Sequence, residues 1–206
     1  MAINFAKTSY EGRTPAIWRG ECKVLPGGFP PKNTLPGGSV IMRGAPLYVD
    51  FDNMEAAVIK AVSVLAGGTT TKPRVAKGHY FAVGDVVMKV GKTDASPSIS
   101  GIDTSNAAYD VLTLSSAISG LTTDDVLVEA TAYEAAVGSG DATPAAEKYL
   151  PNAIVASDLE VKDKLDTLDA AYEAVVLKNV LPCPLQASWL QGIALKNNPN
   201  IIFIKQ

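Results

Sequence analysis

The sequence has few of the residues from which most catalytic and metal sites are built. It contains a single histidine, His79, and only two cysteines, Cys22 and Cys183, among 206 residues. A site with several histidine ligands is therefore excluded, and a Ser-His-Asp triad would have to use His79. The cysteines form no C-x-x-C pair and are too few for a disulfide framework. We expect both to pack as small apolar side chains.

Charged residues and long apolar runs are also scarce. Charged side chains make up 19% of the chain, compared with about 25% in an average protein. The longest apolar stretch, residues 56–66, is interrupted by Lys60 and falls short of the roughly 20 residues that span a bilayer. The first residues have neither the basic start nor the apolar core of a secretory signal. The sequence therefore predicts a protein made in the cytoplasm, with no membrane span.

The net charge of −3 hides a strong asymmetry along the chain. Residues 1–49 carry six basic and two acidic side chains, whereas residues 94–173 carry three basic and fifteen acidic ones. The acidic part is typical of solvated loops and strand edges. Six scattered cations without interleaved aromatic residues make a poor nucleic-acid signature. We therefore expect the basic end to contact a protein surface and the chain to bind no nucleic acid.

Residues 1–38 are interpreted as an extended Pro/Gly-rich N-terminal arm. The unit Leu-Pro-Gly-Gly occurs twice, at 25–28 and 35–38, and each copy favours a turn. Such a segment buries little apolar surface alone, yet it carries apolar and aromatic side chains. We expect it to dock on another protein; the alternative is a strand and loop packed on the protein's own body. The candidate contact residues, chosen because aromatic residues and arginines dominate interfaces, are Arg13, Ile17, Trp18, Arg19 and Phe29.

Residues 39–206 have the pattern of a mainly β body. Short runs rich in β-branched and aromatic residues alternate with Gly, Pro, Asn, Asp or Ser, a spacing typical of a sandwich or small barrel. One or two short helices are also expected. Residues 53–66 have apolar side chains at helical spacing but are equally compatible with buried strands. Residues 184–195 have apolar side chains at intervals of four after a proline, which predicts a short helix.

No catalytic, metal or cofactor motif has good spacing. Residues 91–93 (Gly-Lys-Thr) resemble the end of a phosphate-binding loop, but the glycine needed five residues earlier is Val86. The clustered acids at 158–169 lack the central Gly and final Glu of a calcium loop. His79, with Asp85 as a partner acid, is the remaining catalytic candidate, although a packed or turn-capping histidine is favoured. We therefore predict a non-enzymatic protein with no catalytic residue, metal or cofactor.

Four stretches of the body carry a resemblance to a known family. They are residues 38–50 (GSVIMRGAPLYVD), 74–87 (RVAKGHYFAVGDVV), 102–114 (IDTSNAAYDVLTL), and 152–160 (NAIVASDLE) followed by 174–182 (AVVLKNVLP). In these stretches and in their order along the chain, the sequence resembles the head fibre and capsid decoration proteins of tailed bacteriophages.

This resemblance implies a non-enzymatic virion structural protein on the outer surface of the capsid. The family implies a homotrimer whose N-terminal part holds the major capsid protein, possible contacts with other head proteins, and a role in stabilising or extending the head. It also implies that residues 70–136 form a small β-barrel inserted into a parent sheet of residues 39–68 and 150–206. Because a repetitive shaft is missing, a short fibre base or a decoration knob is expected.

Two other functions stay open at this point. One is a tail or baseplate component, or a carbohydrate-binding knob of the virion, since aromatic rings can stack on sugars. The candidate sugar-binding side chains are Tyr80, Tyr109, Tyr133 and Trp189. The other is an enzyme that uses His79 together with Asp85.

Overall fold

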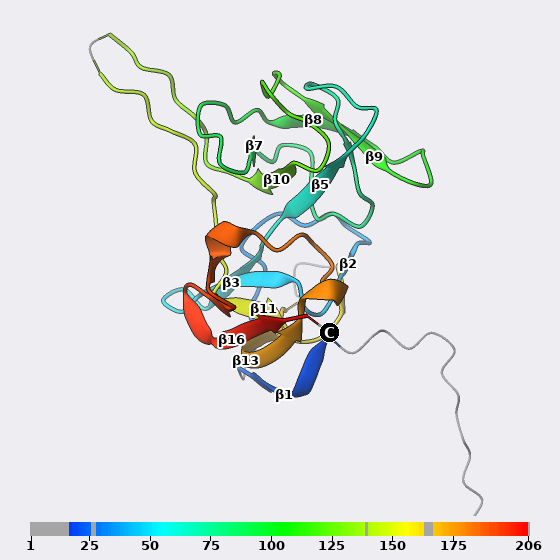
Figure 1. Cartoon of the computed structure of the whole chain (residues 1–206), viewed down its shortest axis with the longest axis vertical. Coiled ribbons are helices and arrows are strands. Elements are labelled where there is room, and N and C mark those ends of the chain that lie inside the picture. Colours follow the sequence, from blue (N-terminus) through cyan, green and yellow to red (C-terminus); the bar gives the residue numbers. More distant parts are fainter. Residues whose placement is uncertain (1–16, 26–27, 139, 163–166, 206) are drawn as a thin grey trace, which may run out of the picture.

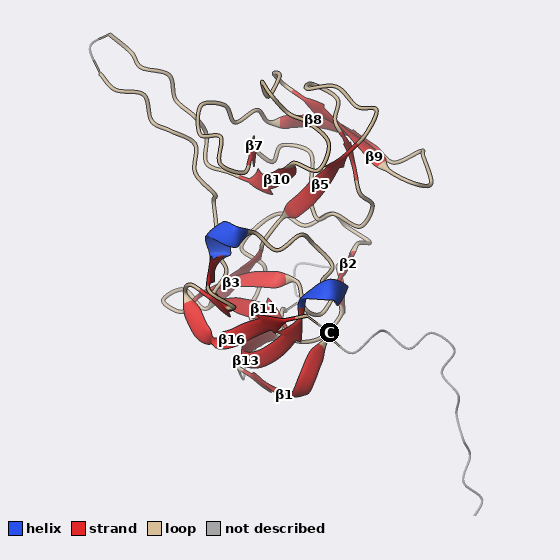
Figure 2. Ribbon diagram, viewed as in Figure 1, coloured by secondary structure: helices blue, strands red, loops and turns tan. Residues whose placement is uncertain are grey.

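The protein is built from two curled β-sheets that lie one above the other along its longest axis (Figures 1 and 2). The computed structural model describes residues 17–25, 28–138, 140–162 and 167–205. With 41% strand and 3% helix, it confirms the mainly β fold class that the sequence predicts. A long hairpin-shaped loop extends away from the upper sheet (Figures 1 and 2).

The lower sheet, which we call the parent lobe, has eight strands. They are β1 (Trp18–Val24), β3 (Pro46–Asp50), β4 (Glu55–Val58), β11 (Ala153–Val155), β13 (Ala170–Leu177), β14 (Leu190–Gln191), β15 (Ala194–Leu195) and β16 (Asn198–Ile204). Their spatial order is β14-β15-β16-β13-β11-β3-β4, and β1 also pairs with β13. β13 is therefore the central strand, and β16 is its parallel neighbour.

The upper sheet, which we call the barrel lobe, has six strands. They are β5 (Ala61–Leu65), β6 (Arg74–Val75), β7 (Val87–Lys89), β8 (Ile99–Asp103), β9 (Asp110–Leu114) and β10 (Val126–Glu129). Their order is β7-β10-β5-β6-β9-β8. The two end strands meet through a bridge between Val86 and Ser98, and the Val87 N–H donates to the Pro97 carbonyl at 2.9 Å. The curled sheet is therefore nearly closed.

The chain leaves the parent lobe after β4 and returns to it at β11. The barrel lobe thus starts at Ala61. The insertion that the resemblance implies was expected to start later, at residue 70. Its last strand ends at Glu129, before the expected limit of residue 136. The earlier start has a simple cause: β5 pairs with β10 and β6 and not with β4.

The two segments that suggested helices fold mainly as strands. Residues 53–66 contain β4 and β5, which resolves the open choice in favour of buried strands. The helix predicted over 184–195 is wrong beyond one short turn, because only η2 (Ala187–Trp189) is helical and β14 and β15 follow it. The remaining elements are η1 (Lys178–Val180) and a small ladder of β2 (Val40–Ile41) with β12 (Leu159–Glu160).

The described residues form three apolar cores, which stabilise the two lobes and the contact between them. One fills the barrel lobe around Phe81 and Leu112, and a second lies on the parent lobe around Phe29 and Leu47. The third is shared, because it joins barrel-lobe residues such as Val128 to parent-lobe residues such as Phe203. The lobes therefore meet through a packed apolar interface and not through a flexible connection.

The structure corrects the prediction of a separate extended arm for residues 17–38. β1 pairs antiparallel with β13, Phe29 bridges to Leu168, and the segment at Lys32 hydrogen-bonds along β4, where the Lys32 N–H donates to the Ala56 carbonyl at 2.7 Å. Exposed sheet edges invite pairing with other chains, and this segment covers one of them. The alternative of a self-packed strand and loop is thus what residues 17–25 and 28–38 adopt, while residues 1–16 lie outside the described part.

We expect Gly44→Ala to test this packing. Gly44 has φ +83°, and a Cβ there would lie 2.7 Å from Ile17 Cγ2, so the variant combines backbone strain of about 1–3 kcal/mol with a steric clash. Gly78→Ala is the matched control, because Gly78 has φ +77° and open space around it. Urea unfolding should show a larger loss of stability for Gly44→Ala. Equal losses in the two variants would contradict the position of Ile17.

Candidate functional site at the junction of the two lobes

The strongest cluster of charged side chains lies where the chain passes between the lobes. Lys60 stands between β4 and β5 and is completely buried. Its Nζ lies 2.6 Å from Asp85 Oδ2 and 4.0 Å from Glu129 Oε2, and it donates a hydrogen bond of 2.6 Å to the Thr34 carbonyl. A buried ammonium is costly unless it is paired and hydrogen-bonded. Here both conditions are met.

Glu129, the last residue of β10, is the second centre of the cluster. Its Oε1 accepts a hydrogen bond from Lys148 Nζ at 2.6 Å, and its Oε2 accepts one from Asn33 Nδ2 at 3.2 Å. Asn33 is buried and also exchanges two hydrogen bonds with the backbone of Val58. The cluster therefore contains two cations and two carboxylates, and it ties the N-terminal segment to both lobes.

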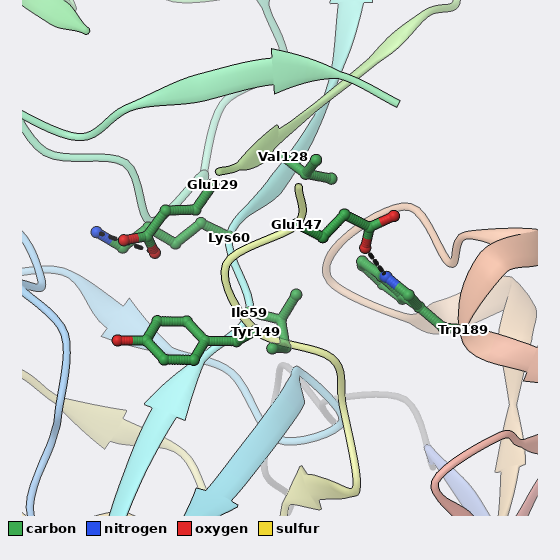
Figure 3. A pocket seen from close by; sticks show the side chains of 7 residues that line it. All are labelled: Ile59, Lys60, Val128, Glu129, Glu147, Tyr149 and Trp189. Carbon is green, nitrogen blue, oxygen red and sulfur yellow. Dashed lines mark hydrogen bonds and ion pairs between the residues drawn. The ribbon is translucent and has the colours of Figure 1, made fainter. Parts of the chain in front are cut away.

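A second polar contact joins the lobes through Glu147. One oxygen of its carboxylate accepts a hydrogen bond from the Trp189 indole N–H, and the other accepts one from Ser188 Oγ at 3.0 Å. Glu147 pairs with Ala130, directly after β10, whereas Ser188 and Trp189 belong to η2 beside the parent lobe. Figure 3 shows Lys60 with Glu129 and Trp189 with Glu147 on two sides of one small hollow.

This hollow is too small for a substrate. The space between Ile59, Lys60, Glu129, Tyr149 and Trp189 is about 10 Å³, which is close to the minimum that one water molecule needs. The charged groups face one another and leave no room for a reacting molecule. The arrangement can hold the two lobes at a fixed angle, which is a structural role.

In the sequence, Lys60 stands out only as an interruption of an apolar run. A lysine within a run of buried residues requires an acidic partner, and this requirement is the signal that could have found the cluster. The partners could not be named from the sequence, because Asp85 and Glu129 lie 25 and 69 positions away along the chain.

His79 lies in the barrel lobe, and the carboxylate that its ring faces is Asp110 and not the predicted partner Asp85. Its Nδ1 accepts a hydrogen bond from the Phe81 N–H at 3.2 Å, so the neutral ring carries its proton on Nε2. Nε2 faces Asp110 Oδ2 at 3.4 Å, while Asp85 is bound to Lys60. Burial lowers the pKa of His79, although the charge of Asp110 acts against this shift. The ring is thus a packed, turn-capping histidine.

The predicted contact residues are placed in very different environments. Ile17 and Phe29 are buried in the protein's own cores, so they are not available to a partner. Trp18 is half-buried against the shared core, and Arg19 is exposed on β1. Arg13 lies outside the described residues. The four described candidates therefore do not form one surface, and Arg19 is the exposed member among them.

The aromatic residues proposed to bind sugar do not form a platform. Tyr80 and Trp189 are buried, and burial raises the pKa of Tyr80 to about 12. Arg74 covers the ring of Tyr109, with its Cζ 4.5 Å from the ring centroid. Tyr133 is half-buried, and it packs against the shared core. This distribution corrects the suggestion that the four rings act together.

Three further expectations concern metals, membranes and cysteines. Within the described residues, no group of three or more His, Cys, Asp or Glu side chains is placed to hold a metal ion. No helix in the described ranges is long and apolar enough to cross a bilayer. Cys22 and Cys183 are both free, and burial raises the pKa of the Cys183 thiol to about 12. Cys183 therefore packs as the apolar side chain that we expected.

Comparison with known proteins gives no relative. No protein-family model matches the chain, and neither a curated protein nor a solved structure gives a significant match.

Lys60→Met should show that the buried cluster is needed for stability. Removing one partner of a buried ion pair leaves the other charge uncompensated, which costs about 3–5 kcal/mol. Urea unfolding monitored by circular dichroism measures this loss. The double variant Lys60→Met with Asp85→Asn is the matched control, because the amide has no charge and its oxygen can still accept the Ala82 N–H. It should regain part of the loss; a double variant no more stable than Lys60→Met contradicts the uncompensated-charge explanation.

Protonation of His79 should make the folded protein less stable in mild acid. Because burial lowers its pKa in the folded state, the stabilisation is complete above the unfolded value of about 6.5 and is lost as the pH falls through the folded value. In His79→Asn the side-chain oxygen can replace Nδ1 as acceptor without titrating. The free energy of unfolding should therefore fall more steeply below pH ~6.5 in the wild type than in the variant. Parallel curves would contradict this assignment.

Proposed function

We propose that the chain is a non-enzymatic virion structural protein that decorates the outer capsid surface as a head fibre or decoration protein. The observation that carries this proposal is where the family-like stretches lie. Residues 38–50 and 152–160 supply strands of the parent lobe and the small β2–β12 ladder, whereas 74–87 and 102–114 supply strands of the barrel lobe. The resemblance therefore covers the framework of both lobes and is not confined to one turn or pocket.

The distribution of charge supports a body that faces water. In the described part of residues 94–173, seven acidic side chains are exposed. These are Asp94, Asp103, Asp124, Glu134, Asp141, Asp158 and Glu160. β1 is more mixed: Arg19, Glu21 and Lys23 are exposed on it, and Lys23 pairs with Glu173 at 2.7 Å. An uneven distribution of charge favours one orientation on a partner, and here the acidic part would face away from the shell.

The proposed docking segment is narrower than the arm that the sequence suggested. Residues 17–25 and 28–38 contribute Ile17, Phe29 and Asn33 to the interior, so they belong to the body. The docking segment is therefore residues 1–16, with Arg13 among them, together with the exposed Arg19 of β1. The partner is the major capsid protein, and the assembly on the shell is a homotrimer.

Deletion of residues 1–16 should abolish binding to capsid shells without unfolding the body. The measurement is co-sedimentation with shells assembled from the major capsid protein of the same virus, with circular dichroism to follow folding. Full-length protein should sediment at a fixed ratio to coat protein. A variant with residues 1–16 in permuted order keeps length and net charge and separates a specific contact from charge attraction.

A longer deletion, of residues 1–37, should fail to fold, because it removes Ile17, Phe29 and the Thr34 carbonyl that Lys60 binds. Normal decoration by the protein that lacks residues 1–16 would falsify the assignment of the docking segment. Failure of the full-length protein to bind shells at all would overturn the proposed function.

A further inference from the structure

The basic side chains of the described part are unevenly paired. Most of its lysines have a carboxylate within ion-pair distance, Lys60 and Lys77 among them. Seven cations of the described part have none. They are Arg19, Arg43, Lys72, Arg74, Lys178, Lys196 and Lys205. Four of these lie at one end of the parent lobe, which we call the basic end: Arg19, Arg43, Lys178 and Lys205.

Two of these cations follow neighbouring strands of the parent sheet. β13 and β16 run parallel, and their last paired residues are Leu177 and Ile204. Lys178 and Lys205 come directly after these two residues, so both lie at the same end of the sheet. The Ile17 carbonyl accepts a hydrogen bond from the Leu177 N–H at 2.6 Å, which places the first described residue at this end too. Figure 1 shows the C mark there, beside β1.

The two arginines of the basic end lie close to Ile17. Arg19 is two positions further along β1, is exposed, and lies opposite Val175 of β13. Arg43 precedes Gly44, where a Cβ would lie 2.7 Å from Ile17 Cγ2. The Nε atom of Arg43 is buried and has no hydrogen-bond partner among the described residues, although buried polar atoms are usually hydrogen-bonded. The guanidinium group is therefore not satisfied by acceptors of the described chain.

The nearby carboxylates do not neutralise the basic end. Asp158 accepts the backbone N–H of Arg43 at 2.8 Å, and Glu21 lies two positions after Arg19 on β1. Neither carboxylate is within ion-pair distance of the four cations. Because complementary charges orient and accelerate association, this end of the parent lobe is suited to contact the carboxylates of another molecule.

Partly exposed apolar side chains lie among the cations. Trp18 and Leu181 are half-buried against the shared core, Ile204 is half-buried at the end of β16, and Met42, next to Arg43, is 36% exposed. Interfaces between proteins are enriched in aromatic residues, Met and Arg, whereas surfaces that bind nucleic acid are more polar and more strongly positive. The composition therefore favours a protein partner.

We propose that the basic end binds an acidic surface of the major capsid protein. This inference rests on the proposed function, and it adds which face of the body lies against the shell and which charge the shell presents there. The docking segment, residues 1–16, joins the body at Ile17, so a segment bound to the shell brings the basic end next to it. Two linked contacts with one shell bind more tightly than either contact alone.

The first test is co-sedimentation of charge-reversed variants with shells assembled from the major capsid protein. In the double variant Lys178→Glu with Lys205→Glu, carboxylates face the acidic surface, and like charges across an interface repel, so affinity should fall about tenfold or more. The matched control is Lys72→Glu with Lys196→Glu. It makes the same change in net charge at two exposed lysines that also lack an ion pair, one in the barrel lobe and one before the opposite end of β16.

The control should bind shells like the wild type, and circular dichroism should show that both double variants are folded. Equal binding by the two double variants, whether both are weakened or neither is, overturns the role of the basic end. If the full-length protein still binds shells in that case, the proposed function stands. Failure of the full-length protein to bind overturns both.

The second test identifies the partner carboxylates without any variant. A carbodiimide joins a lysine amine to a carboxylate in contact with it, with loss of water, and mass spectrometry of the digested complex locates the linked residues. Decorated shells should give Lys178 or Lys205 joined to an Asp or Glu of the capsid protein. Links from these two lysines only to a second copy of this chain, or no link from them to the capsid protein, would show that the proposal is wrong.

Discussion

The buried ammonium group of Lys60 is the constraint on which the rest of the structure depends. It occupies the position where the chain leaves one sheet for the other, and its partners come from the N-terminal segment and from two separate parts of the barrel lobe, at Asp85 and at the end of β10. Each partner must be in place before the charge can be buried, because an unpaired buried charge is unstable. One side chain thereby couples the N-terminal segment to the angle between the two lobes.

The apolar interface alone would define this angle poorly. Much of the shared core consists of alanines and other aliphatic residues, and apolar contacts have little directional preference. The hydrogen bonds of Lys60, Glu129 and Glu147 are directional, and they lie around the same hollow. The packed core stabilises the contact between the two sheets, whereas the polar groups fix the orientation of one lobe relative to the other. A protein with a purely mechanical role, as we propose, needs this rigidity.

The sequence predicted the fold class better than the site, for reasons that particular residues make clear. Short strands between turn residues are a local signal, and it identified a mainly β body. The spacing of Leu185, Trp189 and Ile193 also looked local, but Trp189 binds Glu147, 42 positions earlier, and only the short helix η2 forms. Likewise, the sequence indicates that the apolar side chains of Ile17 and Phe29 pack against a protein surface. Only the structure shows that the surface is the protein's own.

The antiparallel pairing of β5 with β10 places Ala61 opposite Val128. The first and last strands of the barrel lobe are therefore neighbours. The polypeptide enters and leaves that lobe at adjacent positions, next to Lys60 and Glu129. Recombination at these two adjacent positions could exchange the whole lobe for another without rerouting the remaining strands. Lys60 and Glu129 would have to stay, and the new lobe would have to supply a carboxylate in place of Asp85, which pairs with Lys60. The architecture thus permits one parent lobe to carry different surface-exposed lobes.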